Sequence, residues 1–150
     1  DRASRGVYPD LSGPELVRLI ETFMGKRRFT IESEVITDDA ELLRERLIAW
    51  ADEGVDAVFT TGGTGVGPRD FTPDVVREVA QKEIPGIMES IRVTFGASIP
   101  NALCSRSVAV LRNETLIYAL PGSVKAITEY FGEIKKTLHH LVEMVHGLGH

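Results

Sequence analysis

The sequence predicts an α/β protein with three α/β/α layers, in which helices cover both faces of a mostly parallel sheet and a small hairpin is added. Strand-like and helix-like segments alternate through the first half of the chain, which is typical of parallel sheets. Two apolar runs flank the triplet Arg-Asn-Glu within residues 107–120, which indicates the hairpin. The 150 residues suffice for one core, and no linker or repeat divides them, so we predict a single domain over residues 1–150.

The first half of the chain carries the signals that this alternation requires. Residues 12–25 begin with the capping-box pattern Ser-x-x-Glu, have one apolar face and end at glycine. Residues 29–36 alternate between apolar and polar side chains, which predicts a strand with one face toward solvent. A second capping pattern, with Asp38 as the N-cap, begins a helix that ends at Gly54, and residues 55–61 form a short buried strand.

Three further helices are predicted in the second half. Thr-Pro-Asp at 72–74 and Pro-Gly at 85–86 each begin a helix, because proline is favoured at the first helical position. The longest helix follows Pro-Gly-Ser at 121–123, and its apolar residues between 127 and 145 recur every three or four positions. Such an apolar seam can pack on the sheet or against another subunit, and the sequence alone does not choose.

Residues 60–70, Thr-Thr-Gly-Gly-Thr-Gly-Val-Gly-Pro-Arg-Asp, form a glycine-rich segment directly after the buried strand. A Walker phosphate loop is excluded because no lysine follows the glycines, and a dinucleotide-binding pattern is excluded because Pro68 stands at its third glycine position. Glycine still lets backbone N–H groups approach a phosphate closely, and Thr60, Thr61 and Thr64 add hydroxyl donors. The alternative is a tight turn that requires positive φ angles, and both interpretations remain open.

Two aspartates follow predicted strands and therefore belong to the same edge of the sheet. Asp38 and Asp70, beside a phosphate-binding loop, would suit Mg²⁺ bound to a nucleotide. Each also has a simpler interpretation, because Asp38 can cap a helix and Asp70 can cap a turn. Arg69 can pair with a phosphate or with Asp70.

The overall composition limits the classes of function. A net charge of −5 argues against a nucleic-acid-binding protein, which usually presents a basic stripe. No apolar run approaches the ~18 residues needed to cross a bilayer. The single cysteine, Cys104, rules out an internal disulfide and fits a reducing compartment. We therefore expect a cytoplasmic protein that binds neither nucleic acid nor membrane.

Several short motifs follow one another in the order that a known family shows. They are DRASRGVYPD (1–10), TTGGTG (60–65), PRDFTPD (68–74), IPG (84–86), LCSRS (103–107) and LPGS (120–123). On these motifs, most of the chain resembles the molybdopterin adenylyltransferases of molybdenum-cofactor biosynthesis, the MogA/MoaB type. TTGGTG also occurs in molybdate-insertion enzymes and in competence-damage proteins, whereas the DRAS opening and Ser105-Arg106 are more typical of the adenylyltransferases.

The resemblance implies an activity and a set of ligands. Members of the family transfer AMP from Mg-ATP to the terminal phosphate of molybdopterin and release pyrophosphate. The implied substrates are therefore molybdopterin and ATP, with Mg²⁺ as the cofactor. The implied assembly is a homotrimer, with a hexamer as the alternative, and hand-over of the product to a molybdate-insertion protein is also implied.

The resemblance also assigns roles to residues. Asp38 and Asp70 match the two critical aspartates of the family, which implies catalytic and metal-binding roles for both. The other matching residues are implied to bind substrate and nucleotide: Thr60, Thr61, Gly62, Gly63, Thr64, Gly65, Ser105, Arg106, Pro121, Gly122 and Ser123. Among them, the N–H groups of the glycine-rich loop and Arg106 are expected to hold phosphate oxygens.

One departure from the family concerns the start of the sequence. The family has a strand of roughly ten residues before the DRAS motif, in the middle of its sheet. This sequence begins at Asp1. Absence of a central strand would leave two strands unpaired and the core open. We therefore expect a first strand to precede residue 1 in the natural protein.

Three other functions stay open. A molybdopterin carrier or regulatory homologue without catalysis is expected to have lost one of the two aspartates. Molybdate insertion usually belongs to longer, multidomain chains, and a competence-damage hydrolase normally lacks the DRAS opening. Each of these observations favours the adenylyltransferase.

Overall fold

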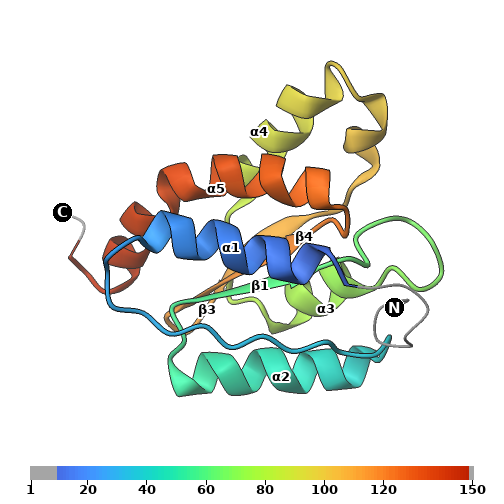
Figure 1. The fold of residues 1–150 in the computed structure, drawn as a ribbon. Coiled ribbons are helices and arrows are strands. Elements are labelled where there is room, and N and C mark those ends of the chain that lie inside the picture. The colour runs from blue at the N-terminus through green and yellow to red at the C-terminus, as the bar shows by residue number, and fades with distance from the viewer. Residues whose placement is uncertain (1–9, 149–150) are drawn as a thin grey trace.

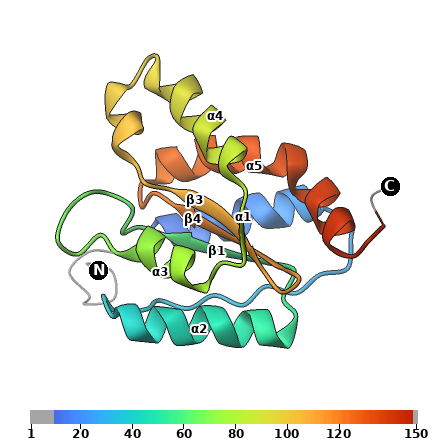
Figure 2. The same cartoon turned by 180° about the vertical axis from the view of Figure 1, so that it is seen from behind.

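The computed structural model describes residues 10–148 and folds them into layers of helices around one sheet (Figure 1). Helices α1 and α5 cover one face of the sheet and α2 and α3 cover the other (Figures 1 and 2), so the predicted three-layer α/β/α architecture is confirmed. Along the chain, the elements are α1 (Ser12–Met24), α2 (Ala40–Glu53), β1 (Ala57–Thr61), α3 (Thr72–Val79), β2 (Lys82–Glu83), α4 (Pro85–Gly96), the 3-10 helix η1 (Pro100–Cys104), β3 (Val108–Arg112), β4 (Thr115–Leu120) and α5 (Val124–Val145).

The sheet divides the apolar core into two clusters. Tyr118 of β4 packs with residues of α1, α4 and α5 on one face, and its neighbour Ile117 packs with residues of α2 and α3 on the other. This alternation follows from the two-residue period of a strand. All six residues of β4 are buried, because helices cover both of its faces.

The strand order is β1-β4-β3-β2, and the pairings contain less parallel structure than predicted. Among the described strands, only β1 and β4 pair in parallel, whereas β3 pairs antiparallel with both β4 and β2. The predicted hairpin at 107–120 is confirmed as β3 and β4, with Asn113 in its turn at a φ of 52°. Parallel pairing is limited because this hairpin supplies both inner strands of the sheet.

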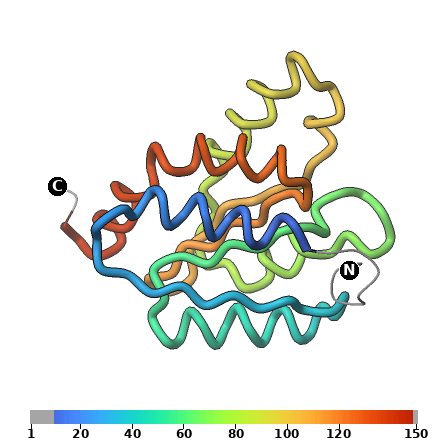
Figure 3. Tube along the Cα trace, in the orientation of Figure 1, coloured from blue at the N-terminus to red at the C-terminus, as the bar shows by residue number. Residues whose placement is uncertain are grey.

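Residues 29–36 do not form the strand that their alternating pattern predicts. They are extended but pair with no strand among residues 10–148. In Figure 3 this segment runs beside β1, from the end of α1 to the start of α2. A cleft of about 1340 Å³ is lined by residues of the segment, including Ile31 and Val35, and by β1. The alternating pattern of residues 29–36 is therefore not matched by strand pairing within residues 10–148.

The apolar seam of α5 packs inside the molecule. Ile127, Phe131, Ile134 and Leu138 are buried against the sheet and α1. The ring of Phe131 lies edge-on to those of Phe23 and Phe59, with centroid distances of 6.0 and 5.9 Å. Of the two possibilities that the sequence left open, packing on the sheet or against another subunit, the structure shows packing on the sheet. None of the described helices is long and apolar enough to cross a membrane.

Candidate functional site

The glycine-rich loop, residues 62–71, lies at the edge of the sheet where β1 and β4 end. The N–H of Gly62 donates to the carbonyl of Leu120 at the end of β4, at 2.9 Å. The hydroxyl oxygen of Ser12, in the first turn of α1, lies 3.3 Å from that of Thr61. The N-termini of α1, α2 and α5 all point to this edge (Figure 1). Helix N-termini carry partial positive charge, so the edge is suited to an anion.

The loop combines a tight turn with unused hydrogen-bond donors. Gly62 and Gly63 have φ angles of 94° and 65°, which other residues rarely adopt. A side chain at Gly65 would place its Cβ 2.7 Å from the Oδ2 of Asp70. Within residues 10–148, the N–H groups of Gly63, Thr64 and Gly65 donate to no acceptor. The turn interpretation and the phosphate interpretation are therefore compatible, since the turn exposes these donors.

Asp70 closes a turn within the loop. Its Oδ2 accepts from the N–H of Gly67 at 2.8 Å, and its own N–H donates to the carbonyl of Gly67 at 3.0 Å. The turn-capping contact that the sequence allowed is therefore present. The second carboxylate oxygen, Oδ1, accepts no hydrogen bond from the described residues. One carboxylate group can thus hold the turn and still contact a ligand.

Asp38 is not the N-cap of α2, contrary to the prediction. The cap is Asp39, whose side chain accepts from the N–H of Leu42 at 3.0 Å. Asp38 instead pairs with Arg69, with 3.8 Å between Oδ2 and Nη1. Arg69 therefore contacts this carboxylate and not that of Asp70. The pair links the segment before α2 to the end of the glycine-rich loop, as the shared edge of the two predicted strands implied.

These two aspartates can serve Mg²⁺ only together with other ligands. Among the described residues, no group of three or more His, Cys, Asp or Glu side chains is placed to hold a metal ion. Mg²⁺ bound to a nucleotide does not need such a group, because it keeps several waters and takes one or two carboxylates plus phosphate oxygens. Asp38 and Asp70, at the edge where the loop donors lie, therefore fit a magnesium–nucleotide complex.

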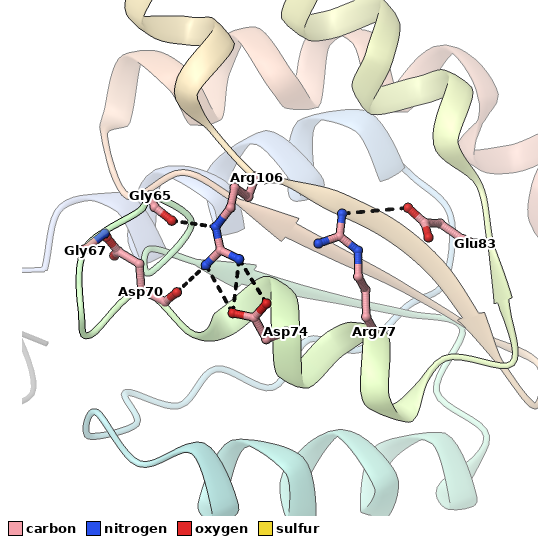
Figure 4. Close-up of polar contacts among 7 residues, drawn as sticks. All are labelled: Gly65, Gly67, Asp70, Asp74, Arg77, Glu83 and Arg106. Carbon is pink, nitrogen blue, oxygen red and sulfur yellow. Dashed lines mark hydrogen bonds and ion pairs between the residues drawn. The ribbon is translucent and has the colours of Figure 1, made fainter.

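Arg106 has all three nitrogens of its guanidinium engaged by protein (Figure 4). Nε donates to the carbonyl of Gly65 at 2.7 Å, and Nη2 donates to the carbonyl of Asp70. Both carboxylate oxygens of Asp74, in the first turn of α3, accept bonds of 2.9 to 3.1 Å. The hydrogen bond from Arg106 lowers the pKa of Asp74, so this carboxylate is charged at every pH above the ordinary aspartate range and neutralises only below it.

The remaining predicted residues line two hollows on either side of the 121–123 turn. Ser105 contacts the glycine-rich loop, since its hydroxyl oxygen lies 3.3 Å from that of Thr64, and it also lies 2.8 Å from that of Ser107. The cleft beside β1 is lined at this end by Asp38, Thr60, Thr61, Gly62, Gly63 and Gly122. A second hollow of about 270 Å³ is lined by Ser105, Pro121 and Ser123 together with Asn101 and Tyr130.

The structure adds residues that the sequence did not reveal. Asp74 was interpretable only as a carboxylate favoured at a helix N-terminus, and nothing in its neighbourhood identifies Arg106 as its partner. Ser12 was expected to cap α1, but it lies in the first turn, after the N-cap Leu11, and its N–H and that of Gly13 donate instead to the side chain of Asp10, both at 3.1 Å. Ser123, expected in the site, also caps α5 by accepting from Ala126 at 3.1 Å. The DRAS motif lies outside the described residues.

Comparisons with known proteins extend over nearly the whole chain. Residues 1–140 match a family model described as "Probable molybdopterin binding domain". The chain is 37% identical to the molybdopterin adenylyltransferase of Helicobacter pylori over 148 residues, 98% of this chain and 84% of that protein. It is 42% identical to the molybdopterin adenylyltransferase of Haemophilus influenzae over 136 residues, 90% of this chain and 68% of that protein. The structure of the molybdopterin biosynthesis enzyme MoaB from Thermus thermophilus matches with a TM-score of 0.84 at 35% identity, covering 98% of this chain and 91% of that one.

Proposed function

The chain belongs to the family of probable molybdopterin binding domains, and from this premise we propose that it is a molybdopterin adenylyltransferase. It transfers AMP from Mg-ATP to the terminal phosphate of molybdopterin and releases pyrophosphate. The relatives that bear this name and align over most of their length support the reaction. The observation that carries the proposal in the structure is the meeting of Asp38, Asp70 and the vacant N–H donors of the glycine-rich loop at one edge.

The reaction needs positioning more than acid–base chemistry. An oxygen of the molybdopterin phosphate attacks the α-phosphorus of ATP, a new P–O bond forms, and the bond to pyrophosphate breaks. The attacking phosphate is already ionised, so no side chain has to remove a proton. The protein therefore contributes by aligning two negatively charged groups and by offsetting their charge.

The described residues divide this task between charges and dipoles. The N–H groups of Gly63, Thr64 and Gly65 would bind phosphate oxygens, assisted by the helix N-termini at the same edge. Asp38 and Asp70 would hold Mg²⁺ directly or through its waters. When bound, the metal ion neutralises charge on the phosphates of ATP. The hollow lined by Ser105, Pro121 and Ser123, next to the loop, would offer room for part of a substrate.

Release of pyrophosphate by the purified protein, given molybdopterin and Mg-ATP, tests the proposal. We expect release that requires all three components and stops when EDTA removes the metal. Reactions without molybdopterin are the control for simple ATP hydrolysis. Tight molybdopterin binding without any release of pyrophosphate would contradict catalysis and would indicate a carrier or regulatory protein instead. Incorporation of molybdate without adenylylation would indicate the insertion activity.

The assembly that we propose is a homotrimer in the cytoplasm, which hands its product to a molybdate-insertion protein. The seam of α5 from Ile127 to Leu138 is buried within the subunit and so is not available for a contact between subunits. Helices α4 and η1 project from the layers (Figures 1 and 2) and expose Val93 and Leu103, at 70% and 57%. Apolar side chains on a projection favour contact with another subunit.

Light scattering at micromolar concentration tests the assembly. We expect the mass of three chains, with six chains as the alternative. Substitution of Val93 by aspartate is expected to shift the mass toward the monomer if α4 forms the contact, because a charge would be buried in an apolar interface. A monomer at this concentration for the unsubstituted protein would contradict the proposal.

A further inference from the structure

The contacts of Arg106 divide the glycine-rich loop into fixed ends and an exposed middle. The guanidinium binds the carbonyls of both Gly65 and Asp70 (Figure 4), whereas residues 66–69 between them are exposed. The backbone N–H of Arg106 also donates to the carbonyl of Thr64 at 2.8 Å. The segment before β3 therefore determines where the loop begins and where it ends.

Asp74 determines which partners Arg106 can take. A guanidinium has five N–H donors, and two loop carbonyls would satisfy only part of them. Without a carboxylate to pair with, the guanidinium of Arg106 would be able to bind any nearby anion, including a substrate phosphate. Asp74 occupies the remaining donors and neutralises the charge, so the donors stay directed at the loop. Because the side chains of Arg106 and Asp74 are 31% and 54% exposed, the pair adds little to global stability.

We propose that Arg106 and Asp74 form a positioning pair for the loop and that Arg106 does not itself bind phosphate. The pair holds residues 62–71 so that the vacant N–H groups and the carboxylate of Asp70 face the substrates together. This changes the role that the family resemblance implies for Arg106, and it gives Asp74 a role. The kinetic consequence rests on the proposed adenylyl transfer, whereas the effect on the order of the loop does not.

An Asp74→Asn variant tests the pair, because asparagine keeps the size of the side chain and loses its charge. We expect kcat to fall by about tenfold, since a small misplacement of the loop costs positioning, while the KM values for ATP and molybdopterin change less than about threefold. Hydrogen exchange of the two amides that are hydrogen-bonded within the loop, those of Gly67 and Asp70, is expected to accelerate on the order of tenfold, because the loop opens more readily. The melting temperature should stay within about 2 °C, as for an exposed ion pair.

Two further variants separate positioning from other effects. Arg106→Lys keeps the charge but not the planar fork, so it should behave like Asp74→Asn, and the double variant should lose no more than either single one. Glu83→Gln is the matched control, because the Arg77–Glu83 pair, 3.9 Å apart, also involves α3 but lies away from the loop (Figure 4). It should change neither kcat nor exchange in the loop.

Each outcome decides the proposal. Normal exchange of the Gly67 and Asp70 amides in both variants would overturn it, as would a large fall in melting temperature. A raised KM for ATP or molybdopterin in Arg106→Lys, with kcat unchanged, would show that Arg106 holds phosphate directly and would also overturn it. If the unsubstituted protein catalyses no adenylyl transfer, the proposed function is wrong, and the exchange experiment still decides whether the pair orders the loop.

Discussion

An Asp70→Asn variant is expected to transfer adenylyl groups at least about a hundredfold more slowly than the unsubstituted protein, as for loss of a preorganised charge partner. The structure sharpens this expectation, because Asp70 has two separable roles. Its Oδ2 accepts from the N–H of Gly67 at 2.8 Å, and an asparagine oxygen can accept the same bond. The substitution therefore preserves the turn and removes only the negative charge that would hold Mg²⁺.

Pyrophosphate release and thermal unfolding of the same variant separate the two roles. The melting temperature should change little, because the turn is kept. Asp56→Asn is a suitable control, since Asp56 is exposed and precedes β1, at the opposite end of that strand from the loop. Normal turnover in Asp70→Asn would remove this residue from the mechanism and leave it as a turn cap. Unfolding of the variant would instead make the carboxylate structural.

The helices were predictable from the sequence because their signals are local. Spacing of apolar residues and glycine at the ends placed α1, α2 and α5 to within a few residues of the observed bounds. The strand predicted at 29–36 did not form within residues 10–148. An alternating pattern shows which face of a segment is apolar but not which strand supplies its hydrogen bonds. The share of parallel pairing in the sheet was overestimated for the same reason, because pairing depends on segments that are far apart in the chain.

The candidate site shows the same limit on a smaller scale. Chain order and strand ends predicted that Asp38 and the glycine-rich loop share an edge, and the Arg69–Asp38 pair is consistent with it. The contact between Arg106 and Asp74 joins residues 32 positions apart and has no local signal. The choice between Asp38 and Asp39 as helix cap was undecidable from residue type, because both are aspartates and differ only in backbone conformation.

Substitutions of the adjacent residues Asp38 and Asp39 are expected to have opposite effects on activity and stability. Asp38→Asn should slow adenylyl transfer on the order of a hundredfold, because it removes the second carboxylate available to Mg²⁺. Loss of its ion pair with Arg69, which spans 3.8 Å to a side chain that is 65% exposed, should cost little stability. Such pairs contribute little to the free energy of unfolding.

Asp39→Ala should show the reverse. It removes the cap of α2 and is expected to lower the free energy of unfolding by about 1 kcal/mol, the usual cost of losing a helix N-cap. Its rate of adenylyl transfer should stay close to normal, because its carboxylate is engaged with the N–H of Leu42. Denaturant unfolding and pyrophosphate release on both variants check the pair of expectations. If Asp38→Asn kept its rate of adenylyl transfer and lost stability instead, the role of Asp38 would be structural. Of the two predicted aspartates, only Asp70 would then remain as a metal ligand.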